Sequence, residues 1–127
     1  MNGILITNNP TVYKKCLDND IDTMYLPTAD FLDVLCVVRN KIHEGYKLLT
    51  HPLSGSIKPN QTPYKSIMVT NDKAQLDVES LKIIEDSIAI ASKLINENKI
   101  PMWTKKILED FQLIDFDLIS RGIESMK

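Results

Sequence analysis

Near its start the chain reads Ile4-Leu5-Ile6-Thr7-Asn8-Asn9-Pro10, an apolar run that turns abruptly polar. Three successive aliphatic residues in so short a run are typical of a strand that is buried on both faces. Asn9 can cap a helix, and Pro10 suits the first helical position because its missing N–H has no partner there in any helix. The stretch therefore predicts a strand that passes directly into a helix.

The rest of the chain repeats this alternation of short apolar runs and helical patterns. Strands are predicted at Thr23–Leu26, Tyr46–Thr50 and Ile67–Thr70. The clearest helical stripe ends at Gly45, where a left-handed C-cap residue belongs, and consists of Phe31, Val34, Leu35, Val38 and Ile42. Later helices are expected after Asp77 as far as Asn96–Asn98, from Pro101 through Leu108, and after a cap at Asp115.

This order of elements predicts one α/β domain spanning residues 1–127. We expect a small three-layer α/β/α arrangement, with helices on both faces of a mostly parallel four-stranded sheet. The direction of the fourth strand is left open by the connection that precedes it. Its end, Val69-Thr70-Asn71-Asp72, resembles Ile6-Thr7-Asn8-Asn9 and favours the parallel direction.

The composition excludes several classes of protein. The chain has 43% hydrophobic and 25% charged residues and a net charge of -2, so it offers no basic field for binding a nucleic acid. No run approaches the ~20 apolar residues of a membrane span, and the expected location is the cytoplasm. Cys16 and Cys36 both fall within apolar helical patterns, which predicts reduced core residues rather than a redox or disulfide pair.

Function is expected to concentrate in the loop at residues 51–66, HPLSGSIKPNQTPYKS. Connections in compact domains usually have about 4–6 residues, so a loop of this length points to a binding or catalytic role. Together with the end of the first strand, it supplies the predicted ligand-binding residues Thr7, Asn8, Asn9, His51, Ser54, Gly55, Ser56, Lys58, Asn60, Tyr64 and Lys65.

Two readings of this loop stay open. Ser54-Gly55-Ser56 followed by Lys58 can form a nest of backbone N–H groups for an anion, or an ordinary turn beside a solvated lysine. His51 can orient a ligand, or act with Ser54 in catalysis. No cofactor is expected, because the chain has neither GxxxxGK[ST] nor GxGxxG, and its two histidines do not suggest a metal cluster.

The sequence resembles the GrdX family over nearly its whole length. The resemblance rests on three strings, which are ITNNP at residues 6–10, LTHPLSGS running into KPN and TPYKS within residues 49–66, and ILEDFQLID at residues 107–115. Members of that family are small proteins encoded beside the selenium-dependent glycine, sarcosine and betaine reductases of anaerobic amino-acid fermentation. The resemblance implies an accessory role around that pathway, without an established activity for any residue.

The leading hypothesis is an accessory protein that binds a small anionic metabolite, such as a carboxylate or phosphate, at residues 7–9 and 51–66. One alternative is an adaptor that contacts a reductase subunit through Trp103 or the loop. The other is a small enzyme that uses His51 and Ser54.

Overall fold

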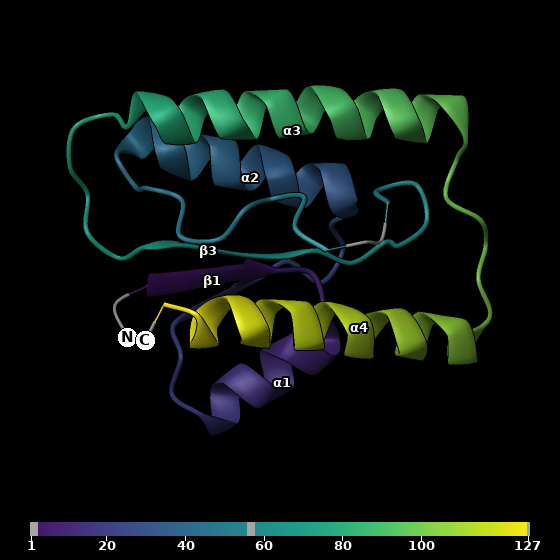
Figure 1. The fold of residues 1–127 in the computed structure, drawn as a ribbon. Helices are drawn as coiled ribbons and strands as arrows, with labels where there is room; N and C mark the ends of the chain where they lie inside the picture. Colours follow the sequence, from purple (N-terminus) through teal and green to yellow (C-terminus); the bar gives the residue numbers. More distant parts are fainter. Residues whose placement is uncertain (1–2, 56–57, 127) are drawn as a thin grey trace.

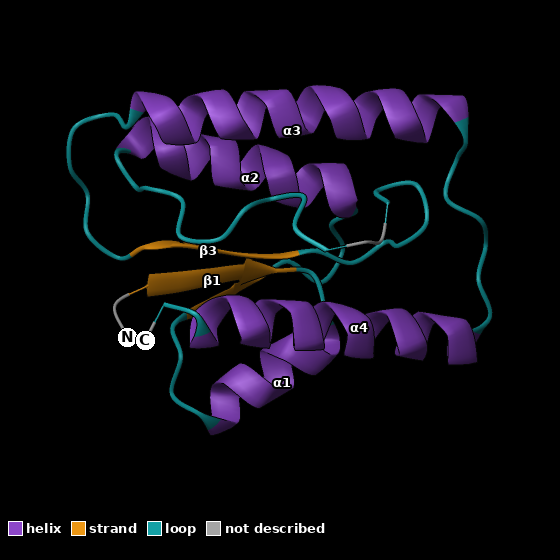
Figure 2. Ribbon diagram, in the orientation of Figure 1, coloured by secondary structure: helices purple, strands orange, loops and turns teal. Residues whose placement is uncertain are grey.

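The protein, seen in a computed structural model that describes residues 3–55 and 58–126, is a sheet with helices on both faces (Figure 1). Figure 2 shows α2 and α3 over one face of the sheet and α1 and α4 over the other. In chain order the elements are β1 (Gly3–Thr7), α1 (Pro10–Asp18), β2 (Thr23–Tyr25), α2 (Phe31–Glu44), β3 (Ser66–Thr70), α3 (Val78–Glu97) and α4 (Lys105–Glu124). The predicted α/β class is confirmed in general.

The predicted four-stranded, mostly parallel sheet is wrong. Within the described ranges the sheet has three strands in the order β2-β1-β3, and it is mixed, since β1 pairs parallel with β2 and antiparallel with β3. The resemblance between residues 69–72 and 6–9 therefore indicated the wrong direction. An apolar run that ends in polar residues marks the end of any buried strand, whichever way that strand runs.

Residues 46–50, which were predicted to form a strand, lie alongside β3 in space but do not form a regular ladder of hydrogen bonds with it. They form an isolated antiparallel bridge between Leu48 and Val69. Side chains take the backbone amides that a ladder would use: Lys47 N donates to Thr70 Oγ1 at 2.9 Å, and Leu48 N donates to Ser80 Oγ at 3.1 Å. Backbone hydrogen bonds also hold the segment beside β3, since Leu49 N donates to Met68 O at 2.9 Å and Thr70 N donates to Lys47 O at 2.8 Å.

Two clusters of buried side chains lie on the two faces of the sheet. Leu5 and Ile6, which are neighbours in β1, belong to different clusters because successive residues of a strand point to opposite faces. Ile6 packs with the predicted stripe of α2, which is fully buried as expected, and with Ile84 and Ala91 of α3. Leu5 packs with Val12, Cys16, Met68 and Ile119 beneath α1 and α4.

The helix ends follow the local signals in the sequence. The Asn9 side chain accepts a hydrogen bond from Thr11 N, and the Asp77 side chain accepts one from Ser80 N, so both predicted N-caps are confirmed. Gly45 has φ of 110°, the left-handed conformation predicted for the C-cap of α2. A Cβ atom at this glycine would lie 2.3 Å from Ala74 O, so only glycine fits.

The two predicted C-terminal helices are one. Thr104 caps α4, which runs unbroken through the expected break and places Asp115 in its middle, with only 5% of that residue exposed. Aspartate is a common cap because its carboxylate can accept backbone N–H groups. Here the carboxylate accepts hydrogen bonds from side chains elsewhere in the fold, namely Asn9 and Ser66, and does not cap a helix. No helix in the described part of the chain is long and apolar enough to span a membrane.

Candidate functional site

Polar residues gather where β1 ends and β3 begins. Because β3 runs antiparallel to β1, its first residue, Ser66, lies opposite Thr7, the last residue of β1. The middle of α4 crosses this edge and brings Gln112 and Asp115 to it. The edge therefore combines segments that are separated by as many as 106 residues in the sequence.

A buried chain of hydrogen bonds joins these segments. Ser66 Oγ donates to Asp115 Oδ2 at 2.7 Å, and the Thr7 hydroxyl lies 2.7 Å from Ser66 Oγ, to which it donates because the Ser66 proton is already used. Asn9 Nδ2 donates to the same Asp115 oxygen at 3.0 Å. A charged acceptor with two buried donors is a strong link, and it fixes α4 to the edge of the sheet.

The amide groups of Asn8 and Asn9 are used within the protein. Asn8 Nδ2 donates to Ala29 O at 3.0 Å and to Pro63 O at 2.8 Å, while its Oδ1 accepts from Lys65 N at 2.9 Å. Asn9 Nδ2 donates to Gln112 O as well as to Asp115, and its Oδ1 caps α1. A ligand could reach these amide hydrogens only by displacing the bonds that tie the loop and α4 to β1.

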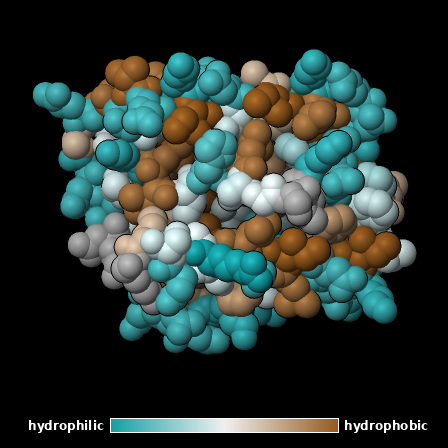
Figure 3. Space-filling model, viewed as in Figure 1, coloured by the Kyte–Doolittle hydropathy of each residue, from teal (hydrophilic) through white to brown (hydrophobic). Residues whose placement is uncertain are grey.

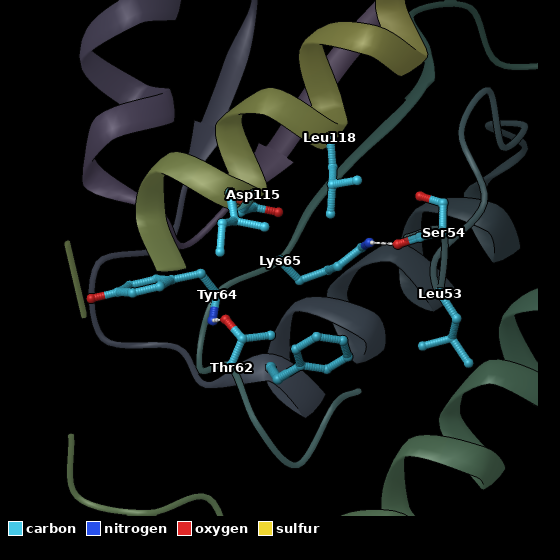
Figure 4. Close-up of a pocket in the computed structure, with 9 residues that line it drawn as sticks. Leu53, Ser54, Thr62, Tyr64, Lys65, Asp115 and Leu118 are labelled. Atoms are coloured by element: carbon cyan, nitrogen blue, oxygen red, sulfur yellow. Dashed lines mark hydrogen bonds between the residues drawn. The ribbon is translucent and has the colours of Figure 1, made fainter. Parts of the chain in front are cut away.

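A small cavity lies beside this network, between the loop, the start of α2 and α4 (Figure 4). Its volume is about 20 Å³, which is room for one water molecule or one oxygen atom of a larger ligand. Polar and apolar side chains share its lining, which consists of Phe31, Leu53, Ser54, Thr62, Tyr64, Lys65, Ile114, Asp115 and Leu118.

Lys65 is the unusual residue of the cavity. It is only 5% exposed, and Figure 4 shows its side chain extending away from Asp115 toward Ser54. Its Nζ donates to Ser54 O at 3.5 Å, a long hydrogen bond, and none of the ion pairs found among the described residues includes it. Burial lowers the pKa of Lys65, and the negative charge of Asp115 opposes that shift.

The three strings that carry the resemblance to the GrdX family converge on this edge of the sheet. Residues 6–10 supply the asparagines, residues 49–66 supply the loop with Lys65 and Ser66, and residues 107–115 supply Gln112 and Asp115. The sequence profile of the GrdX-like protein family matches residues 4–124. The chain belongs to this family. No curated protein and no solved structure gives a significant match to it.

In this GrdX-like chain, the predicted catalytic pair is not joined. His51 is exposed, and its Nδ1 accepts a hydrogen bond from Leu53 N at 3.0 Å. In the described part of the loop, Ser54 bonds to His51 through backbone atoms, since Ser54 N donates to His51 O at 3.2 Å. Nδ1 of the imidazole therefore stabilises a turn, and within the described part of the loop no hydrogen bond joins the imidazole to the Ser54 hydroxyl.

The structure describes only part of the predicted anion-binding nest, Ser54-Gly55-Ser56 with Lys58. Gly55 has φ of 98°, the left-handed conformation that a nest requires, and a Cβ at this position would lie 2.7 Å from Leu118 Cδ1 of α4. Ser56 lies outside the described residues. Lys58 is exposed, and its backbone N donates to Gln61 Oε1 at 3.2 Å, so the lysine that faces the cavity is Lys65.

The second half of the loop is fastened to α4 and to the segment before it. The Tyr64 hydroxyl accepts from Gln112 Nε2 at 2.9 Å, and Trp103 Nε1 donates to Gln61 O at 2.7 Å. The Trp103 ring also packs against Phe111, with 5.8 Å between ring centroids. Asn60 is half-buried, and its Oδ1 has no hydrogen-bond partner.

Sequence reasoning missed Gln112 and Asp115 as members of the site. A usable signal was present, since Asp115 lies four residues after Phe111 and four before Ile119, on the stripe of α4 that faces the protein. A carboxylate on such a stripe needs buried donors, and Thr7, Asn9 and Ser66 are the hydroxyl and amide groups at the neighbouring strand ends. Among the described residues, no cluster of three or more His, Cys, Asp or Glu side chains is arranged to hold a metal ion.

Proposed function

We propose that this chain is an accessory protein of glycine or betaine reductase metabolism, and that it binds a small anionic ligand through Lys65. The metabolic context rests on what the family resemblance implies. The binding role rests on a single observation, which is that the buried Lys65 ammonium has one long hydrogen bond and lies against a cavity.

An anion would supply what this lysine lacks. An ammonium group has three donors, and burying it without a charged partner is costly, so a ligand oxygen that enters the cavity gains a charge-assisted hydrogen bond. The cavity admits one such oxygen, and the rest of the ligand would lie at the mouth beside the exposed residues Ser54 and Ile114. A carboxylate or phosphate group of a small metabolite fits this description.

Asp115 limits the direction of approach. Its charge opposes an anion, but two donors already bind its Oδ2, and Lys65 points away from it. The favoured approach is therefore from the Ser54 side. Binding would also raise the pKa of Lys65, because a negative ligand stabilises the charged amine, so ligand affinity should fall as the pH rises and the free lysine loses its proton.

Thermal unfolding with added ligands tests this proposal. Phosphate, sulfate, glycine, betaine and acetyl phosphate are compared at matched ionic strength, because general screening also changes stability. A ligand at 100 times its dissociation constant adds about 2.7 kcal/mol of stability. We expect at least one of them to raise the melting temperature of the wild type and of Lys58→Met, and not that of Lys65→Met.

The proposal fails if none of these ligands stabilises the wild type, or if Lys65→Met responds as the wild type does. Lys58→Met is the matched control, because it removes an exposed charge from the same loop and leaves the cavity unchanged. An effect lost in both variants would indicate a dependence on the charge of the loop in general.

An adaptor for a reductase subunit is the second candidate, and the exposure of apolar side chains favours it. Met102 and Leu113 are largely exposed, and hydrophobic surface lies over α4 in the face seen in Figure 3. Trp103 is half-buried and bonded to the loop, which makes Met102 the better contact residue. In a pull-down from a lysate that contains the reductase, capture that Met102→Ser abolishes and Lys58→Met preserves would favour the adaptor.

A further inference from the structure

We infer that the Lys65 amine forms an imine with a small carbonyl compound, an aldehyde or a 2-oxo acid, that enters the adjoining cavity. The inference deepens the proposed function, on which it rests in one respect: a 2-oxo acid is a small anion that would use the same site. It assigns to Lys65 the formation of a covalent bond, in addition to the electrostatic binding of an anion.

The backbone of Lys65 is held in place while its amine is nearly free. Lys65 N donates to Asn8 Oδ1 at 2.9 Å, and Ser66, the next residue, begins β3 and is bonded to Asp115. At the other end of the side chain, Nζ has the single 3.5 Å bond to Ser54 O. A fixed backbone with a lightly bonded terminal amine is the arrangement of a group that reacts, since little has to be broken before it attacks.

The surroundings increase the fraction of neutral amine, the nucleophilic form, that is in equilibrium with the ammonium at a given pH. Lysines that form imines in enzymes are kept uncharged by burial or by neighbouring cations. Lys65 is 5% exposed, and Phe31, Leu53 and Leu118 supply apolar surface around it. Burial lowers its pKa from the ordinary value of 10.5 even though Asp115 is near, so a lone pair is available at lower pH than on an unperturbed lysine.

The reaction needs no component beyond the amine and the carbonyl compound. The Nζ lone pair attacks the carbonyl carbon and forms the C–N bond, and the carbonyl electron pair moves to oxygen. The two protons of the amine leave with that oxygen as water, and the C=N bond remains.

The size of the cavity restricts the carbonyl compound. About 20 Å³ accommodates the carbonyl oxygen and little else, so the substituents on the carbonyl carbon must extend past Ser54 toward solvent. Unhindered compounds such as glyoxylate should therefore react, and a bulky aromatic aldehyde should react more slowly at Lys65 than at exposed lysines.

Reductive trapping tests the inference on the full chain. The protein is incubated at neutral pH with glyoxylate and sodium cyanoborohydride, which reduces imines to stable secondary amines, and the modified lysines are located by peptide mass spectrometry. We expect labelling of Lys65 to exceed that of exposed Lys58, and this excess to vanish near pH 10.5, where ordinary lysines also lose their protons. Lys58→Arg should leave the Lys65 adduct unchanged.

Labelling of Lys65 no faster than Lys58 in the folded wild type would overturn the inference, and this readout requires no variant at Lys65. The outcome is separable from that of the anion site. Stabilisation by phosphate without trapping at Lys65 would leave the proposed function standing and remove the imine. Trapping at Lys65 without stabilisation by any anion would support the imine and contradict the proposed anion-binding function.

Discussion

Replacing Lys65 by methionine should stabilise this protein, although most substitutions of buried residues destabilise. Methionine keeps most of the alkyl chain of a residue that is 5% exposed, and it removes the ammonium, which has one 3.5 Å hydrogen bond. Burial of a polar group without adequate partners costs about 1–3 kcal/mol, and the lost attraction to Asp115 offsets part of the gain. We therefore expect the free energy of unfolding to rise by about 1–2 kcal/mol, which corresponds to roughly 4–7 °C in melting temperature for a domain of this size.

The stabilisation should depend on pH in a definite direction. The pKa of Lys65 is lower in the folded protein than the ordinary value of 10.5, so between these two values the unfolded chain binds more protons than the folded one. Wild-type stability must then increase with pH across that window. Lys65→Met lacks this contribution, so its advantage over the wild type should be largest below the folded-state pKa and should shrink as the pH approaches 10.5.

Urea unfolding followed by circular dichroism measures both effects, at neutral pH and at several values up to 10.5. Lys58→Met serves as the control, and as an exposed substitution it should change stability by less than about 0.5 kcal/mol. A Lys65→Met variant that is less stable than the wild type at neutral pH would refute the reasoning. So would an advantage that stays constant over the whole pH range.

Three further predictions concern the same region. Gly55→Ala should cost about 1–2 kcal/mol in urea unfolding, because its φ of 98° is strained for alanine and the new Cβ meets Leu118; an unchanged midpoint would contradict this. Ser66→Ala should cost about 1–3 kcal/mol in the same assay, because it leaves Asp115 with one of its two buried donors, and a neutral result would mean that water replaces the hydroxyl. Hydrogen exchange without any ligand should show protected amides within residues 51–66, since the three prolines of the loop limit its freedom in the unfolded state; fast exchange throughout the loop would count against a preformed site.

Local signals in the sequence were sufficient to predict where several helices begin or end. The caps at Asn9 and Asp77 and the glycine at the end of α2 each act within a few residues of their own position, so the pattern and the structure agree. Strand pairing has no such local cause. The direction of β3 relative to β1 depends on the path of residues 51–65. Residues 46–50 bond partly to the β3 backbone and partly to the hydroxyls of Thr70 and Ser80, and these distant partners leave no signal within the segment itself.

The strand end and the long loop were predicted to lie together, but the contacts that their side chains make were not predicted. The strand end and the long loop do meet, yet Asn8 and Asn9 use their amides to hold them together, and the cavity is lined by Lys65 rather than Lys58. Asp115 was interpreted as a helix cap, because the residues that bind its carboxylate are 49 and 106 positions away. The pattern of apolar residues within α4 cannot predict which distant residues bind this carboxylate.

The dependence of the site on α4 has a consequence for biosynthesis. A nascent chain that has emerged from the ribosome only through α3 contains β1, β3 and the loop, but neither Gln112 nor Asp115. Until α4 is made, the hydroxyl of Ser66 and the amide of Asn9 face solvent, and no α4 covers Leu5 and Met68. Closure over so long a separation in sequence is slow, because the chain entropy is lost before the contacts form. The cavity around Lys65 thus forms only after α4 has been made, and no intermediate that lacks α4 can display the chemistry that depends on it.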